Sequence, residues 1–164
     1  MINFNIWMIV LETNEKRLEN YKHLHAQLGC KKFAAIDTIS FFEKYSQFAL
    51  DNNYTTQLYI NKLQRPGKLG CNLSHQLLLT DILQNSSTDW NLIIEDDIGL
   101  NNYDPERINT ILEQADLYKS NYIQLYTHDR FLRTQRAQKK IFTSLYEMCP
   151  QWGTVAYFIN KAGF

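Results

Sequence analysis

A continuous apolar run near the amino terminus constrains the fold most strongly. Residues 6–11 (IWMIVL) contain no polar side chain, which is typical of a strand buried on both faces in a parallel sheet covered by helices. Thr13 or Asn14 can cap an amphipathic helix that follows, and Gly29 can end it. Residues 32–36 (KFAAI) then predict a second strand. The chain therefore opens with a β-α-β unit.

Strands and helices continue to alternate along the rest of the chain. Further strands are predicted at residues 90–95, 122–126, 141–146 and 154–159. Further helices are predicted around residues 41–49, at 73–83 after a turn at 65–67 and a cap at Asn72, from Asp104 onward, and from 160. Residues 130–140 are basic and predict a solvated loop. This order favours an α/β sandwich with a mostly parallel central sheet, in a single domain that spans residues 1–164.

Composition excludes several classes of protein. The chain has 164 residues, of which 45% are hydrophobic and 21% are charged, so it can bury a core of ordinary size. Its formal net charge of zero gives no indication of nucleic-acid binding. The three cysteines lack CxxC spacing, which indicates buried, reduced thiols rather than a disulfide framework or a zinc site. No apolar run approaches the roughly 20 residues of a transmembrane segment, and no signal peptide is recognisable.

Three consecutive acids follow the strand predicted at residues 90–95. Glu95, Asp96 and Asp97 stand at the carboxyl end of a buried strand, where ligand sites of open α/β sheets are found. If the strand stays extended, Glu95 and Asp97 share one side and Asp96 faces the other. Two carboxylates side by side suit Mg²⁺ or Mn²⁺. The alternative is a set of solvated loop acids, and spacing alone does not separate the two readings.

The surrounding sequence resembles the family-25 glycosyltransferases, which include bacterial lipooligosaccharide galactosyltransferases and, more distantly, collagen galactosyltransferases. The resemblance is carried by GKLGCNLSHQLLLTDIL and, after a short loop, WNLIIEDDI. The matching residues there are Gly67, Gly70, Cys71, Ser74, His75, Glu95, Asp96 and Asp97. The opening IVLETNEKR matches through Arg17, and the closing WGTVAYFINKAGF matches through Gly153, Thr154, Tyr157 and Gly163. These segments span nearly the whole chain in the family's order.

The resemblance implies a GT-A-like nucleotide-binding sandwich that uses a UDP-sugar donor and Mn²⁺ or Mg²⁺ as cofactor. The acidic triplet takes the place of the Asp-x-Asp motif of such enzymes. Glu95 and Asp97 are then the predicted catalytic metal ligands, and Asp96 is the predicted contact to the ribose or galactose of the donor. Family members generally continue past the equivalent of Phe164, so the fold is expected to be C-terminally incomplete relative to the family.

The remaining donor-binding predictions combine the resemblance with position along the chain. The predicted donor-binding residues are Leu11, Glu12, Thr13, Arg17, Asp37, Ser74, His75 and Asp96. Four of them have a structural alternative: Ser74 and His75 can stabilise a helix start, Arg17 can be an exposed helix residue, and Asp37 can be a turn acid. Cys71 reads most simply as a buried small residue.

The predicted function is metal-dependent, inverting transfer of a hexose, galactose by the resemblance, from a UDP-sugar to a glycan acceptor such as lipooligosaccharide. The predicted location is the cytoplasm, with peripheral contact at the inner face of the membrane, no transmembrane segment and no nucleic-acid partner. Two other functions are compatible with the acids. One is a nucleotide-binding module of the same fold without turnover, and the other is a metal-dependent phosphoryl-transfer enzyme or hydrolase.

Overall fold

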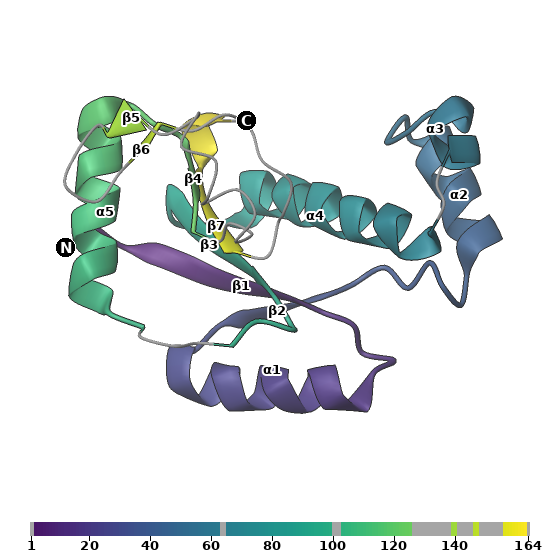
Figure 1. Ribbon diagram of the computed structural model, residues 1–164, viewed down its shortest axis with the longest axis horizontal. Helices are drawn as coiled ribbons and strands as arrows, with labels where there is room; N and C mark the ends of the chain where they lie inside the picture. Colours follow the sequence, from purple (N-terminus) through teal and green to yellow (C-terminus); the bar gives the residue numbers. More distant parts are fainter. Residues whose placement is uncertain are drawn as a thin grey trace.

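A five-stranded sheet forms the centre of the molecule (Figure 1). The computed structural model describes residues 2–62, 65–99, 103–125, 139–140, 146–147 and 156–163. The sheet has the order β2-β1-β3-β7-β4. Its strands are β1 (Phe4–Val10), β2 (Lys31–Ala34), β3 (Trp90–Glu95), β4 (Tyr122–Gln124) and β7 (Ala156–Asn160). β5 (Lys139–Lys140) and β6 (Tyr146–Glu147) pair with each other in a separate antiparallel ladder.

The central sheet is mixed but mostly parallel. β1 pairs in parallel with both β2 and β3, whereas β7 runs antiparallel to β3 and to β4. β7 is therefore the one strand of this sheet that opposes the others. The α/β class and the mostly parallel sheet predicted from the sequence are confirmed, and the arrangement is consistent with a GT-A-like fold.

Helices cover both faces of this sheet. The helices are α1 (Glu15–Leu28), α2 (Phe42–Asp51), α3 (Gln57–Lys62), α4 (Pro66–Asn85) and α5 (Pro105–Tyr118), with a 3₁₀ turn η2 at Lys161–Gly163. Figure 1 shows α1 and α4 on opposite sides of the strands. The short helices α2 and α3 lie beyond one end of α4, away from the sheet (Figure 1). The helices α1, α4 and α5 and the sheet thus form an α/β/α sandwich.

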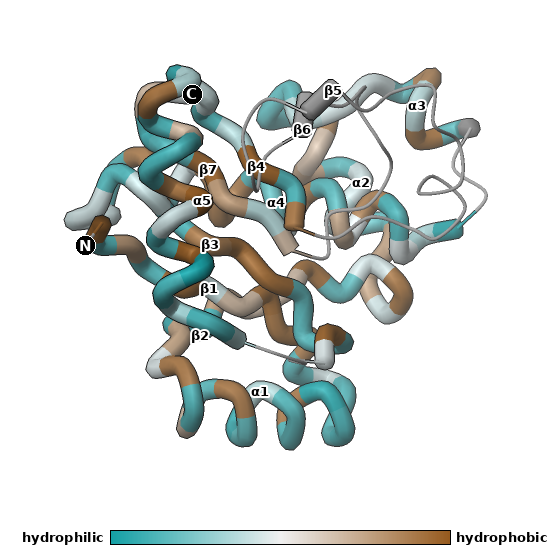
Figure 2. The backbone as a smooth tube through the Cα atoms, turned by 60° about the vertical axis from the view of Figure 1, so that its left-hand side comes forward, coloured by the Kyte–Doolittle hydropathy of each residue, from teal (hydrophilic) through white to brown (hydrophobic). Residues whose placement is uncertain are grey.

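Alternation along the strands sends side chains into two separate cores. Met8, Val10 and Ile94 belong to the core that includes Leu24 of α1 and Leu112 of α5. The neighbouring strand residues point the other way: Trp7, Ile9 and Ile93 pack with Leu78 and Ile82 of α4. In Figure 2, β3 is drawn largely in the brown of hydrophobic residues, whereas hydrophilic and hydrophobic residues alternate along α1. Both faces of the strands are buried, as the apolar run at residues 6–11 predicts.

The predicted helix ends are confirmed for α1 and α5. The Asn14 side chain accepts a hydrogen bond from the Arg17 backbone N–H, and Gly29 ends α1 in the left-handed conformation, with φ of 63°. Asp104 caps α5 by accepting hydrogen bonds from the backbone N–H groups of Glu106 and Arg107. The side chains that start these helices therefore satisfy backbone donors that would otherwise lack partners.

The prediction for the start of α4 is wrong. Residues 65–67 were expected to form a turn and Asn72 to cap the helix, but α4 already begins at Pro66. Proline suits the first position of a helix because it lacks an N–H that would have no helical partner there. Ser74 and His75 therefore lie in the third turn of α4 rather than at its start. The short helix α3 was also not predicted, because its segment is largely polar.

The C-terminal third is described only in part. The predicted strand at 122–126 is seen as β4, which ends at Gln124, and the strand predicted at 154–159 is seen as β7, which ends at Asn160. Residues 126–138, 141–145 and 148–155 lie outside the described residues, and with them most of the predicted loop at 130–140 and of the predicted strand at 141–146. In the part of the chain that is described, no helix has the length and apolar character to cross a bilayer.

Gly70 is required where α4 crosses the end of β2. A Cβ atom at Gly70 would lie 2.5 Å from the backbone oxygen of Ile36 and 2.7 Å from Oγ1 of Thr38, whereas a Cβ at Gly67 would meet no atom within 4 Å. We expect Gly70→Ala to lower the free energy of unfolding by about 1–3 kcal/mol, as overpacking does. The matched change Gly67→Ala should leave stability unchanged or slightly raised, because alanine favours a helix. Urea unfolding of both variants measures the difference, and equal effects would contradict this account of the contact.

Candidate active site

An open cleft lies at the carboxyl ends of the three neighbouring parallel strands. The registers Ile9↔Glu95 and Val10↔Ala34 bring the ends of β1, β2 and β3 side by side. The cleft has a volume of about 240 Å³. The residues lining it are Ile9, Leu11, Arg17, Ala35, Ile36, Asp37, Thr38, Ile39, Gly67, Gly70, Cys71, Ser74, His75, Glu95, Asp96 and Asp97. Its position is the one at which open α/β sheets bind ligands.

Asp96 is the buried member of the acidic triplet. Its side chain is only 2% exposed, and Oδ2 accepts a 2.6 Å hydrogen bond from the backbone N–H of Leu11. Oδ1 forms a 2.7 Å ion pair with Nη1 of Arg17. Asn20, which lies with Arg17 on helix α1, donates hydrogen bonds to the backbone oxygens of Asp96 and Ile98. Asp96 thereby joins the end of β1, helix α1 and the turn after β3, while its predicted contact with a donor sugar stays a prediction.

Asp97 does not share a side with Glu95, contrary to the strand-alternation argument. The strand ends at Glu95 and the chain turns at Asp96 and Asp97, so the two-residue period no longer applies. Asp97 Oδ2 lies 3.4 Å from Nη2 of Arg17, and its side chain is 50% exposed. Arg17 therefore faces both aspartates, while Asp97 remains the carboxylate most accessible from the cleft.

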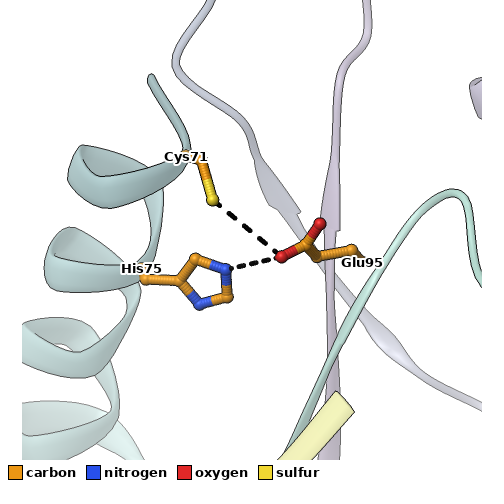
Figure 3. Close-up of side chains that lie close together, drawn as sticks. All are labelled: Cys71, His75 and Glu95. Carbon is orange, nitrogen blue, oxygen red and sulfur yellow. Dashed lines mark hydrogen bonds and ion pairs between the residues drawn. The ribbon is translucent and has the colours of Figure 1, made fainter. Parts of the chain in front are cut away.

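Glu95 faces helix α4. It lies two residues after Ile93 on β3, and Ile93 packs against α4, so strand alternation sends both side chains to the same side. Its Oε1 lies 3.1 Å from Nε2 of His75, and His75 Nδ1 lies 2.8 Å from Oη of Tyr157 on β7 (Figure 3 shows the first of these contacts). Burial alone would lower the pKa of His75, but hydrogen bonds and charge interactions with Cys71 and Glu95 outweigh it and raise this pKa to about 9. Near neutral pH the imidazole is therefore protonated and both ring nitrogens donate. Burial also raises the pKa of Tyr157, so its hydroxyl keeps its proton.

Two predicted donor-binding residues, Ser74 and Asp37, line the cleft but also hold the backbone around it. Ser74 is buried; its Oγ donates to the backbone oxygen of Gly70 and accepts from the N–H of Ile36. Oδ1 of Asp37 accepts from the backbone N–H groups of Ile39 and Ser40, and these hydrogen bonds, led by that of Ser40, lower the pKa of Asp37. Both side chains thus fix the segment between β2 and α2.

Only some of the donor-binding residues predicted in the segment after β1 line the cleft. Leu11 and Arg17 line the cleft, whereas Glu12 and Thr13 are not among its lining residues. Glu12 instead forms a 2.5 Å ion pair with Lys32 on β2. The hydroxyl of Thr13 donates to Oδ2 of Asp37 at 3.1 Å, so Thr13 supports a lining residue from outside. A direct contact of either residue with a donor remains a prediction.

The sequence reading missed the contribution of Cys71. It was expected to be buried, but it is exposed and lines the cleft one helical turn from His75. Its Sγ lies 3.9 Å from Oε1 of Glu95 (Figure 3). The signal was available in the CxxxH spacing, since residues four apart share one face of a helix. Tyr157, noted only as a motif match, was likewise missed as the partner of His75.

The charges of the described cleft residues leave one carboxylate that could hold a cation. The protonated imidazole of His75 faces Glu95, and the guanidinium of Arg17 makes its shorter contact with Asp96. Asp97 is thus the least compensated carboxylate in this part of the cleft. Carboxylate oxygens at such a site suit Mg²⁺ or Mn²⁺, which bind through one or two carboxylates and leave other positions for phosphate oxygens.

Comparison with known protein families identifies the class of the chain. The model of glycosyltransferase family 25, described as an LPS biosynthesis protein, matches residues 3–163. The chain therefore belongs to glycosyltransferase family 25, and the resemblance drawn from its motifs is confirmed. This membership makes it a glycosyltransferase of the kind that acts in lipopolysaccharide biosynthesis. A search of curated proteins gives no match.

Asp96 and Asp97 should differ sharply in their effect on stability. Asp96→Ala leaves the N–H of Leu11 without its acceptor and removes the closer partner of Arg17, so we expect a loss of about 3 kcal/mol in unfolding free energy. Asp97→Ala removes a half-exposed ion pair and should change stability by less than about 1 kcal/mol. Urea unfolding of the two variants provides the comparison. A larger loss for Asp97→Ala would refute the structural role given to Asp96.

The pKa of His75 predicts a loss of stability at alkaline pH. Because the folded value, about 9, lies above the ordinary 6.5, the stabilisation is complete below pH 6.5 and disappears as pH rises through 9. Its size is on the order of 3 kcal/mol. Glu95→Gln removes the charge that faces the imidazole and should move the decline to lower pH. Unfolding free energies between pH 6 and 10, with NMR titration of the His75 ring, measure both effects, and an unchanged midpoint in Glu95→Gln would contradict the assignment.

Proposed function

We propose that this chain transfers a hexose, galactose in the first instance, from a UDP-sugar to a glycan acceptor such as lipooligosaccharide, with inversion and with dependence on Mn²⁺ or Mg²⁺. Family membership supports the general reaction. The observation that carries the specific proposal is the cleft at the ends of β1, β2 and β3, whose lining includes Glu95, Asp96 and Asp97. A nucleotide donor fits this position because sheet-end clefts of α/β proteins commonly bind nucleotides.

A divalent cation is needed on electrostatic grounds. The diphosphate of a UDP-sugar is anionic, and the least compensated acid of the cleft, Asp97, would repel it. Asp97 is half exposed and supplies a hard oxygen donor at the cleft. Asp97 would therefore be the first ligand of Mn²⁺ or Mg²⁺, and Glu95, which faces α4, would join it by rotation of its side chain. When bound, such an ion would offset the negative charge that develops on the departing UDP.

The chain's own residues divide the remaining tasks. Arg17 is 38% exposed and held by Asp96, so its guanidinium is fixed at the edge of the cleft, where it can face a phosphate. Leu11 and Asp37 follow β1 and β2, and this side of the cleft is the place we assign to the nucleoside. Asp96 supports the site by holding Leu11 and Arg17 in position.

The side of the cleft that would bind the glycan acceptor is proposed from two exposed apolar side chains and from the membership of the chain in family 25. Ile39 lines the cleft with 72% of its surface exposed, and Phe41 nearby is also exposed. Apolar side chains at the entrance suit a lipid-linked glycan. On this proposal the chain works in the cytoplasm, in peripheral contact with the inner face of the membrane.

Calorimetric titration with UDP-galactose, with and without Mn²⁺ or Mg²⁺, tests the donor and the metal together. We expect binding only with the ion present. Asp97→Ala and Glu95→Ala should each weaken that binding at least about tenfold, as loss of a metal ligand does. Glu19→Gln, an exposed acid change on α1, is the matched control and should bind as the unmodified chain does. Circular dichroism confirms that each variant is folded.

The outcomes distinguish the competing functions. Mass spectrometry of a glycan acceptor after incubation with UDP-galactose should show an added hexose. Release of phosphate without sugar transfer would favour a phosphoryl-transfer enzyme or hydrolase. Metal-dependent nucleotide binding without transfer to any acceptor would favour a binding module. No binding of UDP-galactose with either ion, in a folded chain, would reject the proposal.

A further inference from the structure

Three different metal-ligating side chains converge at one wall of the cleft. Cys71 and His75 lie four residues apart on α4, so both point from the same helical face toward Glu95 at the end of β3 (Figure 3). The ligand atoms of all three lie within 4.8 Å of one another. Among the described residues, this is the one group of three or more His, Cys, Asp or Glu side chains whose ligand atoms lie this close together.

The distances already approach those of a tetrahedral metal site. Oε1 of Glu95 lies 3.1 Å from Nε2 of His75 and 3.9 Å from Sγ of Cys71. In a tetrahedral zinc site with bonds of about 2.0–2.3 Å, ligand atoms are separated by roughly 3.3–3.5 Å. For these two pairs, changes of a few tenths of an ångström at side-chain ends would reach that spacing, and the ligand atoms of Cys71 and His75 lie within 4.8 Å of each other.

The ring nitrogen of His75 that points away from Glu95 is held as in a metal-binding histidine. Nδ1 contacts Oη of Tyr157 at 2.8 Å, and His75 and Tyr157 are both buried. Metal-ligating histidines almost always use their second ring nitrogen to donate to an oxygen, which fixes the ring. The Tyr157 hydroxyl can accept that hydrogen bond, leaving the Nε2 lone pair for an ion. This contact is an independent sign that the ring is positioned for coordination.

We propose that Cys71 Sγ, His75 Nε2 and a carboxylate oxygen of Glu95 bind Zn²⁺, with a fourth position open to the cleft. The thiolate and imidazole select zinc over Mn²⁺ and Mg²⁺, which prefer oxygen ligands. Binding releases the thiol proton of Cys71 and the Nε2 proton of His75 to solvent. The site shares Glu95 with the pair proposed for the donor but takes its other ligands, sulfur and nitrogen, from α4. The inference does not depend on sugar transfer. Cysteine spacing alone does not indicate such a site, because its ligands are a cysteine, a histidine and a glutamate from two different elements.

Cobalt spectroscopy tests the site directly. Titrating the reduced full chain with Co²⁺ should produce the visible bands of tetrahedral cobalt and a thiolate-to-cobalt charge-transfer band, and Zn²⁺ should abolish them by displacement. Cys71→Ser should lose the charge-transfer band, whereas Cys30→Ser, at a cysteine in the core that does not line the cleft, should keep it. His75→Gln and Glu95→Gln should each weaken binding at least about tenfold. Because Cys71 is exposed, Cys71→Ser is expected to fold, and circular dichroism checks this.

The control Asp97→Ala separates this inference from the proposed function. It should retain the thiolate-to-cobalt charge-transfer band while losing metal-dependent binding of UDP-galactose. Absence of a thiolate band in the unmodified chain, its persistence in Cys71→Ser, or its loss in folded Cys30→Ser would overturn the zinc site. Equal cobalt affinity in folded His75→Gln would do the same. None of these results depends on whether the chain binds a nucleotide.

Discussion

The buried carboxylate of Asp96 is the interaction on which the cleft depends. The registers of β1 and β3 place their carboxyl ends side by side, but they do not determine where the chain goes next. Asp96 does so by accepting from the N–H of Leu11 and pairing with Arg17. A carboxylate that is 2% exposed is tolerated only with such partners. The contacts with Leu11 and Arg17 therefore offset the lost solvation of the Asp96 carboxylate. The same contacts fix the positions of β1, α1 and β3 around the cleft.

A series of hydrogen-bonded side chains holds the other wall of the cleft, on the side of α4. Tyr157, His75 and Glu95 come from β7, α4 and β3, and they are joined by hydrogen bonds of 2.8 and 3.1 Å. The antiparallel direction of β7 matters here, because it brings the beginning of that strand, with Tyr157, beside the end of β3. A parallel strand in that position would present its carboxyl end instead. The departure from a fully parallel sheet thus positions a partner for His75.

Much of the fold could be predicted because its signals are local. The buried strands, the Asn14 and Asp104 caps and Gly29 follow from apolar runs and from backbone donors that need partners. The start of α4 could not be predicted correctly, because Arg65, Pro66 and Gly67 resemble a turn in isolation. Only the packing of Gly70 against Ile36 shows why a glycine stands inside a helix. That contact joins residues distant in sequence, and no local pattern contains it.

The candidate site was predictable in its residues but not in its geometry. The motif identified Glu95, Asp96 and Asp97, and alternation correctly placed Glu95 and Asp96 on opposite faces. Alternation failed at Asp97 because hydrogen bonding of the strand ends at Glu95, and the strand's end is set by its neighbours. The exposure of Cys71 depends on how α4 lies over the sheet, which again is a tertiary property.

The three acids therefore have three different environments rather than one shared role. Asp96 is buried and bound to the backbone and to Arg17, Asp97 is half exposed, and Glu95 is held by His75 beside Cys71. A hard cation would find oxygen donors toward Asp97, and a softer one would find sulfur and nitrogen toward α4. Glu95 lies between the two sets. Because one carboxylate serves both directions, the orientation of its side chain links the chemistry of the sheet end to that of the helix.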